Sequence, residues 1–127
     1  MIQSLNTKVD LVIEATSFMS FSYYGKIMIG DKSFEFYDSR DPRKNIQIPW
    51  NEIDYVIVSV LFKGKWIPRY AIQTKRNGTY TFASKDSKKV LRNIRNYIDQ
   101  DHIVCSLSFF DIVKRAFKSL FRKKKLQ

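Results

Sequence analysis

Residues 23–37 read YYGKIMIGDKSFEFY and carry the clearest strand pattern in the chain. The alternation over residues 23–29 sets up two faces, with Tyr23, Ile27 and Ile29 on one and Tyr24, Lys26 and Met28 on the other. Gly30 and Asp31 then suit a tight turn, and residues 33–37 place Phe34 and Phe36 on one face. This stretch predicts an antiparallel hairpin with an apolar side.

Strand patterns continue on both sides of this hairpin. Five more strands are predicted, at residues 8–19, 46–48, 53–62, 66–74 and 79–83. Lys63, Gly64 and Lys65 suit one turn, and Asn77 and Gly78 suit another because both residues tolerate a positive φ. Seven short strands separated by turns about every 8 to 12 residues are typical of small sandwiches and barrels.

The apolar period changes to that of a helix after residue 84. Ser84 or Asp86 can cap this helix. Its apolar stripe consists of Val90, Leu91, Ile94, Tyr97 and Ile98, and its other face carries Lys88, Lys89, Arg92 and Arg95. Seven strands followed by one amphipathic helix describe a PH-like barrel whose helix plugs an open end. We therefore expect a mostly β, α+β domain over residues 1–100.

A second amphipathic helix is predicted over residues 109–122, after a capping box of Ser108 and Asp111. At about 100° per residue, one arc is wholly apolar and holds Phe109, Phe110, Ile112, Val113, Ala116, Phe117, Leu120 and Phe121. The opposite arc holds Asp111, Lys114, Arg115, Lys118, Ser119 and Arg122. At ~21 Å this helix is too short to span a bilayer.

This second helix suits an anionic interface, because its apolar arc lies beside a dense row of cations. Residues 102–127 hold seven basic side chains and one acidic one. We expect residues 101–127 to dock on a membrane or a partner through Phe109, Phe110, Val113, Lys114, Phe117, Lys118, Leu120, Phe121, Arg122, Lys123, Lys124 and Lys125. The alternative is that the apolar arc packs back onto the barrel as ordinary core.

The composition sets the class of protein and of partner. A chain of 127 residues with 44% hydrophobic and 15% aromatic residues predicts one globular domain. The net charge of +11 indicates an anionic partner, either nucleic acid or an acidic lipid surface. Cys105 is the only cysteine, which suits a reducing compartment. The polar start and the short apolar runs predict neither a secretory signal nor a membrane-spanning helix.

Five blocks of sequence resemble one family. They are KVDLVIEATSFM at residues 8–19, YGKIMIGDK at 24–32, IQIPWNEIDYVI at 46–57, GKWIPRYAIQTK at 64–75 and SLSFFDIVKRAFKSLF at 106–121. Together they resemble the PH-like mannose operon protein O family, which is encoded with mannose-class phosphotransferase permeases in Gram-positive bacteria. The resemblance implies a cytoplasmic protein associated with such a permease or with regulation of its operon, and it supplies no catalytic motif.

Two loops are candidate protein contacts. Phe18, Met19, Phe21, Tyr23 and Tyr24 crowd the first turn, where either most face the core or Phe21 is exposed as a contact or membrane wedge. The first hairpin of lipid-binding PH domains is basic, whereas this one reads SFSY at residues 20–23, which argues against a specific inositide site. Around the second turn, Lys63, Lys65, Trp66 and Arg69 form either a plain sheet edge or a docking loop.

No constellation of catalytic or metal-binding residues is found in the sequence. His102 and Cys105 are the only histidine and cysteine, so they lack the further ligands or orienting group that a metal or nucleophile site needs. The four glycines are expected at turns or strand starts, so none forms a phosphate-binding loop. We read the carboxylates near the loop and the corner as solvated, namely Asp38, Asp41, Glu52 and Asp54.

The sequence therefore predicts a protein without enzymatic activity, cofactor, metal or small-molecule substrate. We expect a cytoplasmic accessory or regulator of a mannose-class permease that lies at the inner face of the membrane. Its partners would be the permease membrane subunits and an anionic lipid surface. A basic regulator that binds nucleic acid is the alternative, although a helix that reads a groove needs only a narrow apolar seam rather than a full apolar half.

Overall fold

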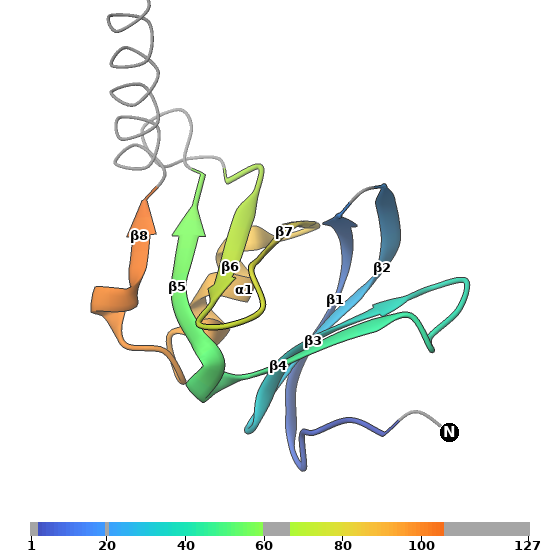
Figure 1. Ribbon diagram of the computed structural model, residues 1–127, viewed down its shortest axis with the longest axis horizontal. Coiled ribbons are helices and arrows are strands. Elements are labelled where there is room, and N and C mark those ends of the chain that lie inside the picture. The colour runs from blue at the N-terminus through green and yellow to red at the C-terminus, as the bar shows by residue number, and fades with distance from the viewer. Residues whose placement is uncertain (1–2, 20, 60–66, 106–127) are drawn as a thin grey trace, which may run out of the picture.

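The computed structural model describes residues 3–19, 21–59 and 67–105, and Figure 1 shows their arrangement. The first half of the sheet is an antiparallel meander of β1 (Val9–Phe18), β2 (Ser22–Gly30), β3 (Ser33–Asp38) and β4 (Asn45–Pro49). Ile29 pairs with Phe34 across the turn that follows Gly30, which confirms the predicted hairpin.

A short 3-10 turn, η1 (Trp50–Glu52), leads into the second half of the sheet. This half contains β5 (Ile53–Val58), β6 (Tyr70–Thr74) and β7 (Thr79–Ser84), so β5 ends and β6 begins inside the ranges that the sequence predicts. Gly78 has a φ of 81°, as the predicted turn requires. β7 then pairs with β1, where Phe18 lies opposite Thr81, and this pairing joins the two halves.

An eighth strand that the sequence analysis missed extends the sheet. After η2 (Gln100–His102), β8 (Ile103–Cys105) pairs in parallel with β5, so the sheet continues beyond residue 100. The strand order is β4-β3-β2-β1-β7-β6-β5-β8. The sheet is open, with β4 and β8 at its edges, so the described residues do not show the expected barrel. The fold is mostly β with one helix, in the α+β class.

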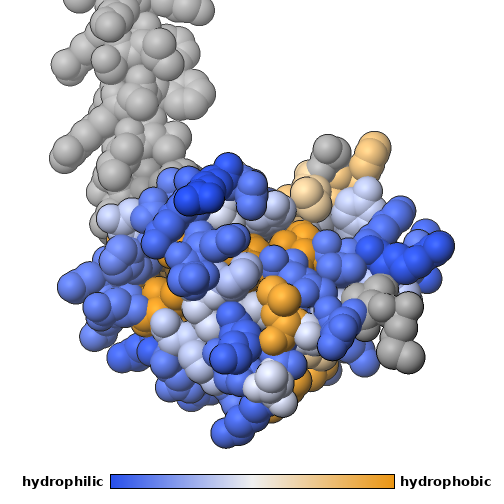
Figure 2. Space-filling model, turned by 60° about the horizontal axis from the view of Figure 1, so that its bottom comes forward, coloured by the Kyte–Doolittle hydropathy of each residue, from blue (hydrophilic) through white to orange (hydrophobic). Residues whose placement is uncertain are grey.

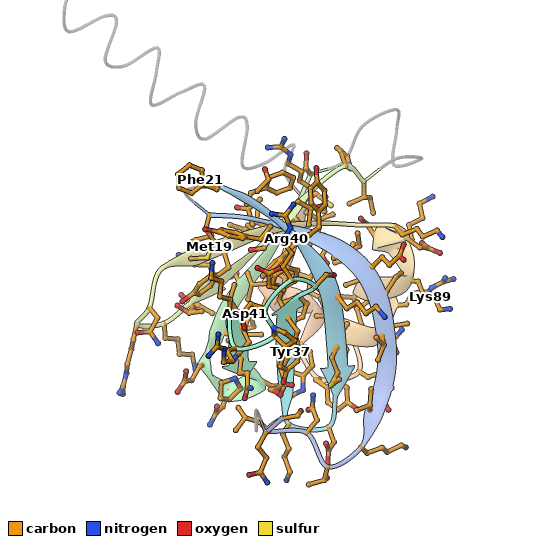
Figure 3. All side chains as sticks on the ribbon, turned by 90° about the vertical axis from the view of Figure 1, so that its right-hand side faces the viewer. Met19, Phe21, Tyr37, Arg40, Asp41 and Lys89 are labelled. Atoms are coloured by element: carbon orange, nitrogen blue, oxygen red, sulfur yellow. The ribbon has the colours of Figure 1, made fainter. Side chains whose placement is uncertain are left out.

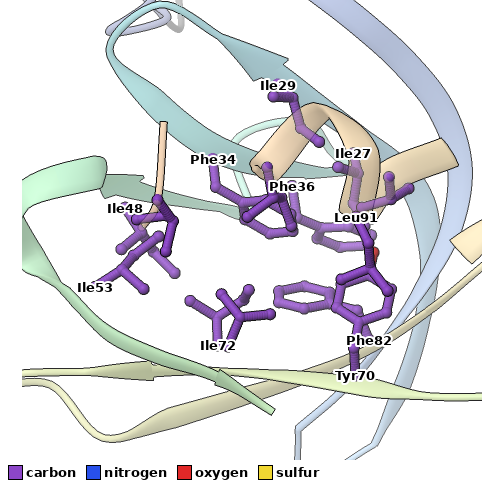
Figure 4. Packing of buried hydrophobic residues seen from close by; sticks show 14 of the residues in the cluster. Ile27, Ile29, Phe34, Phe36, Ile48, Ile53, Tyr70, Ile72, Phe82 and Leu91 are labelled. Atoms are coloured by element: carbon purple, nitrogen blue, oxygen red, sulfur yellow. The ribbon is translucent and has the colours of Figure 1, made fainter. Parts of the chain in front are cut away.

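Phenylalanine and isoleucine side chains from both halves of the sheet form the core (Figure 4). Phe34 and Phe82 lie with their ring centroids 5.1 Å apart, and Phe34 meets Tyr70 edge to face at 6.5 Å. Gly25 lies within β2 and is buried, which corrects the expectation that every glycine occupies a turn or a strand start. The curved sheet thus encloses a continuous aromatic layer.

The helix α1 (Ser87–Ile94) covers one end of this core. Asp86 caps it, because its carboxylate accepts a hydrogen bond from the backbone N–H of Lys89 at 3.1 Å. Val90 and Ile94 are fully buried, as the apolar stripe predicts. Tyr97 follows the helix and stacks on Trp50 at 4.9 Å, and the Trp50 indole donates to the Gly30 carbonyl at 2.8 Å. The covered end of the core is therefore the Gly30 end of β2.

The segment before β1 crosses the outer face of β3. The Glu35 carboxylate is fully buried there and accepts hydrogen bonds from the Ser4 hydroxyl at 2.6 Å and the Leu5 N–H at 3.0 Å. It also accepts from the Ser33 hydroxyl and from the Tyr37 phenol. Burial, together with this bond to Glu35, raises the pKa of Tyr37 to about 12. Hydrogen bonds to this buried carboxylate thus hold the residues before β1 against the sheet.

The surface is mostly hydrophilic on the face that Figure 2 shows. Its main hydrophobic projection, at the upper right, lies where Figure 1 draws the end of the β1–β2 hairpin. No helix in the described part of the chain combines the length and the apolar character that a membrane crossing needs.

Candidate functional site

The end of the β1–β2 hairpin is the most exposed apolar feature of the described residues. We call it the β1–β2 tip, made of Phe18, Met19 and residues 21–24. Met19 is 55% exposed, Phe21 72% and Tyr24 73%. Figure 3 shows Phe21 projecting from the end of the hairpin, and a hydrogen bond from the Met19 N–H to the Phe21 carbonyl at 3.1 Å closes the turn. The expectation that most of these side chains face the core is wrong.

The strand pairing explains why no described strand covers Met19 and Phe21. The pairing of β1 with β2 ends at Phe18 opposite Ser22. The pairing of β1 with β7 also ends at Phe18, opposite Thr81. Met19 and Phe21 therefore lie beyond the last paired residues of the sheet. Tyr97, which follows α1, lies toward the other end of β2, where it stacks on Trp50 beside Gly30.

Cations flank the tip on both sides. The guanidinium of Arg69 lies over the Phe18 ring at 4.3 Å, and the ammonium of Lys44 lies 5.6 Å from the centre of the Tyr23 ring. The loop between β3 and β4 reaches the tip, because the Ser39 N–H donates to the Tyr24 carbonyl at 3.0 Å. Apolar side chains at the end of a hairpin are thus bordered by positive charge.

Arg40 and Arg43 add to the positive charge of this loop, and both are exposed. Arg43 also offsets the negative charge of Asp41, whose carboxylate lies 3.0 Å from the Arg43 guanidinium. Hydrogen bonds from Arg43 lower the pKa of Asp41, so this carboxylate is ionised at neutral pH and paired. Figure 3 shows Arg40 beneath the tip in that view.

A hollow of about 200 Å³ lies between the tip and the β3–β4 loop. It is lined by Ser17, Met19, Tyr23, Phe36, Asp38, Lys44, Asn45 and Ile46. Asp38 is 7% exposed, which corrects the reading of this carboxylate as solvated. It was misread because the sequence shows a polar loop after residue 37, whereas the structure continues β3 through Asp38 and turns its side chain inward.

The other predicted site residues fall into two groups. Phe21 and Arg69 belong to the described part of the chain, and both contribute to the tip and its flanks. The remaining ones lie outside the described residues, namely Lys63, Lys65, Trp66 and the twelve docking residues between 109 and 125. Sequence reasoning missed Arg40 and Lys44 as companions of Phe21, although the basic loop DSRDPRK at residues 38–44 already carried the signal.

His102 packs against residues of β5, and Cys105 lies on the edge strand β8. His102 Nδ1 lies 2.7 Å from the carbonyl oxygen of Asp54, and the His102 ring stacks on Tyr55 at 5.1 Å. Cys105 is exposed in β8. Within residues 3–19, 21–59 and 67–105, no group of three histidine, cysteine or acidic side chains is placed to hold a metal ion.

Comparison with known proteins gives one family and one fold. The model of a family described as a domain of unknown function, DUF956, matches residues 1–117. No curated protein is detectably similar in sequence. Among solved structures, the C-terminal domain of an unknown protein from Leishmania infantum has a similar fold, with a TM-score of 0.62 and 14% identity. The match covers 71% of this chain and 83% of that one, and at this identity the likeness concerns the fold alone.

Proposed function

We propose that this chain, which belongs to the DUF956 family, is a non-enzymatic docking module that acts at the inner face of the cell membrane. Its partner there would be a mannose-class phosphotransferase permease, which it would serve as a cytoplasmic accessory or regulatory protein. The resemblance of five sequence blocks to the mannose operon protein O family supports the choice of permease. The properties of the β1–β2 tip support the choice of surface.

The observation that carries this proposal is the exposure of Phe21 and Met19 among cations. A side chain as apolar as Phe21 gains roughly 1.5–3 kcal/mol when it leaves water completely. Each nearby cation adds about 1 kcal/mol close to an anionic leaflet. Arg40, Lys44 and Arg69 border the same tip. Docking of the tip on an acidic membrane would therefore gain both the apolar and the electrostatic contribution.

The C-terminal sequence supports the same surface. Residues 109–122 place four phenylalanines on one arc and cations on the other, and Lys123, Lys124 and Lys125 follow. These residues lie outside the described part of the chain, so their contribution rests on the sequence pattern alone. Two apolar and basic elements would bind a membrane more tightly than either does alone, because the second contact is made at high effective concentration.

We also propose that the fold is a PH-like barrel in its strand connections. Seven strands precede one amphipathic helix, and that helix covers the Gly30 end of the core. The first and last of the seven strands pair with each other, β1 with β7. Among the described residues, no helix covers the opposite end of the core, where the tip lies.

Vesicle pelleting of full-length protein tests the proposed surface. Phe21→Ser should weaken binding to anionic vesicles about tenfold or more, because an apolar anchor is lost. Val12→Ser is the matched control, since Val12 is also exposed, at 50%, but lies on β1 away from the tip. Equal binding by the two variants would remove the tip from the proposal. Failure of the protein to co-purify with the permease in mild detergent would contradict the permease as its partner.

Nucleic-acid binding is the second candidate, and the net charge of +11 favours it. The exposed face of α1 carries Lys88, Lys89 and Arg92, and Figure 3 shows Lys89 on the outer side of the helix. Binding through such a face would weaken steeply with salt, because counterions are released from the phosphates. Gel-shift titrations at two salt concentrations test it, and binding without sequence preference above background would remove a specific operon regulator.

A further inference from the structure

The hollow between the β1–β2 tip and the β3–β4 loop is lined in part by two buried polar residues. Ser17 is 1% exposed, and its hydroxyl has no hydrogen-bond partner among the described residues. Asp38 is 7% exposed and accepts one backbone hydrogen bond, from the Arg40 N–H at 3.0 Å. A buried carboxylate with a single hydrogen bond favours a further donor, whereas the Ser17 oxygen is closed off from the hollow.

The hollow also has a positively charged side chain on its wall, which forms no ion pair among the described residues. Lys44 lines it from the position just before β4, where its carbonyl accepts a hydrogen bond from the Asp38 N–H, and its ammonium lies near the Tyr23 ring. The ion pair of the described residues is Arg43 with Asp41, and no nitrogen of Lys44 comes within 4.0 Å of the Asp38 carboxylate. Opposite charges therefore line one small space without neutralising each other.

The remaining walls are apolar. Phe36 and Ile46 come from paired positions on β3 and β4, and Tyr23 and Met19 come from the hairpin above them. A volume of about 200 Å³ is below the usual range for drug-sized ligands and suits a small one. Aromatic faces beside a carboxylate favour a bound ammonium group.

We propose that this hollow binds a small zwitterion in which a primary ammonium group lies next to an anionic group. The ammonium would donate to the Asp38 carboxylate. The anionic group would face Lys44. A phosphate alone is disfavoured by Asp38, and an amine alone is disfavoured by Lys44. The phosphoethanolamine group, free or as a lipid headgroup, has this chemistry.

The site stands independently of membrane docking, so its first test uses a soluble probe. O-phosphoethanolamine is titrated into full-length protein and followed by amide NMR and calorimetry. We expect shifts at Ser17, Asp38 and Lys44, and affinity at least about tenfold higher than that for ethanolamine or inorganic phosphate. Lys44→Gln and Asp38→Asn should each weaken binding about tenfold.

Arg43→Gln is the matched control, because Arg43 lies in the same loop but pairs with Asp41 outside the hollow. It should bind the probe like the unchanged protein. If Asp38→Asn does not fold, Lys44→Gln decides alone, since Lys44 is exposed. Absence of shifts at the hollow, or equal affinity for phosphoethanolamine and phosphate, would overturn the proposal, and the space would then hold water only.

A second arm identifies the source of the zwitterion. Vesicles with phosphatidylethanolamine are compared with vesicles that contain phosphatidylcholine at equal surface charge. Stronger binding to the first, lost in Lys44→Gln, identifies the lipid headgroup, whereas equal binding identifies a free ligand. Phe21→Ser separates this site from the proposed function, because it should weaken vesicle binding about tenfold and leave binding of soluble phosphoethanolamine unchanged.

Discussion

At the scale of single residues, Gly25 shows how closely β2 and β3 approach each other. It pairs with Asp38, and a Cβ placed on it would overlap the carbonyl oxygen of Tyr37 and lie 2.9 Å from Cζ of Phe36. The nearest obstacle is backbone and cannot rotate away. Gly25→Ala should therefore lower the free energy of unfolding by ~1–3 kcal/mol or more, as measured by chemical denaturation.

Gly78→Ala is the control for this prediction. Gly78 has a φ of 81° but open space around its Cα, so alanine there meets only the conformational cost of about 1–2 kcal/mol. The two variants separate steric overlap from backbone strain. A loss for Gly25→Ala no greater than the loss for Gly78→Ala would mean that β3 moves aside to admit the methyl group.

At the scale of elements, the segment before β1 is fastened to the β2–β3 turn by a second carboxylate. Asp31 accepts hydrogen bonds from the Thr7 hydroxyl and from the N–H groups of Thr7 and Lys8, at 2.8 and 2.9 Å for the latter two. The bond from the Thr7 hydroxyl is the main cause that lowers the pKa of Asp31 to about 2. This attachment should hold at neutral pH and weaken in acid.

The sign follows from the direction of the shift. Since the folded pKa is below that of the unfolded chain, the stabilisation is fully present above about pH 4 and is lost as the pH falls toward about 2. The amide NMR shifts of Thr7 and Lys8 should titrate with a midpoint near 2. Asp31→Asn should abolish this titration, and a midpoint near 4 would contradict the attachment.

The sequence predicts elements well where local pattern and tertiary packing agree. The hairpin of β2 and β3 and the helix α1 were predicted because their apolar faces in sequence are the faces that the core buries, as Ile27, Phe34 and Val90 show. β8 was missed because three residues carry no period, and only the parallel pairing with β5 makes them a strand. Such a long-range contact cannot be read from local sequence.

The candidate site was predicted only in part for a related reason. Phe21 was recognised as a candidate contact, but apolar side chains are more often buried than exposed, so the sequence favoured the core for its neighbours. The exposure of Met19 follows from the end of both β1 pairings at Phe18, whereas Tyr24 is exposed because it points away from the core side of β2, which Tyr23 faces. Asp38 turns inward because β3 is one residue longer than its apolar pattern. The exposure of Met19 and the burial of Asp38 depend on how far neighbouring strands run.

At the scale of the whole molecule, the tip and the C-terminal sequence make one proposal with two parts. The second part is the apolar arc of residues 109–122. If this arc faces lipid or the permease, changing Phe110, Phe117 and Phe121 to serine should strongly weaken membrane binding. At roughly 1.5–3 kcal/mol for each side chain, the affinity should fall by two or more decades, while the melting temperature stays unchanged.

The opposite result is equally specific. If the arc packs against the sheet as core, the same triple change opens cavities and costs a comparable free energy of unfolding. The melting temperature then falls and membrane binding remains, carried by the tip. Phe21→Ser in the same background tells the cases apart, because a protein anchored at both elements should lose the remaining vesicle binding only when both are changed. Thermal unfolding and vesicle pelleting are measured for the unchanged protein, the triple variant, Phe21→Ser and the combined variant. Together they assign the lost free energy either to folding or to docking.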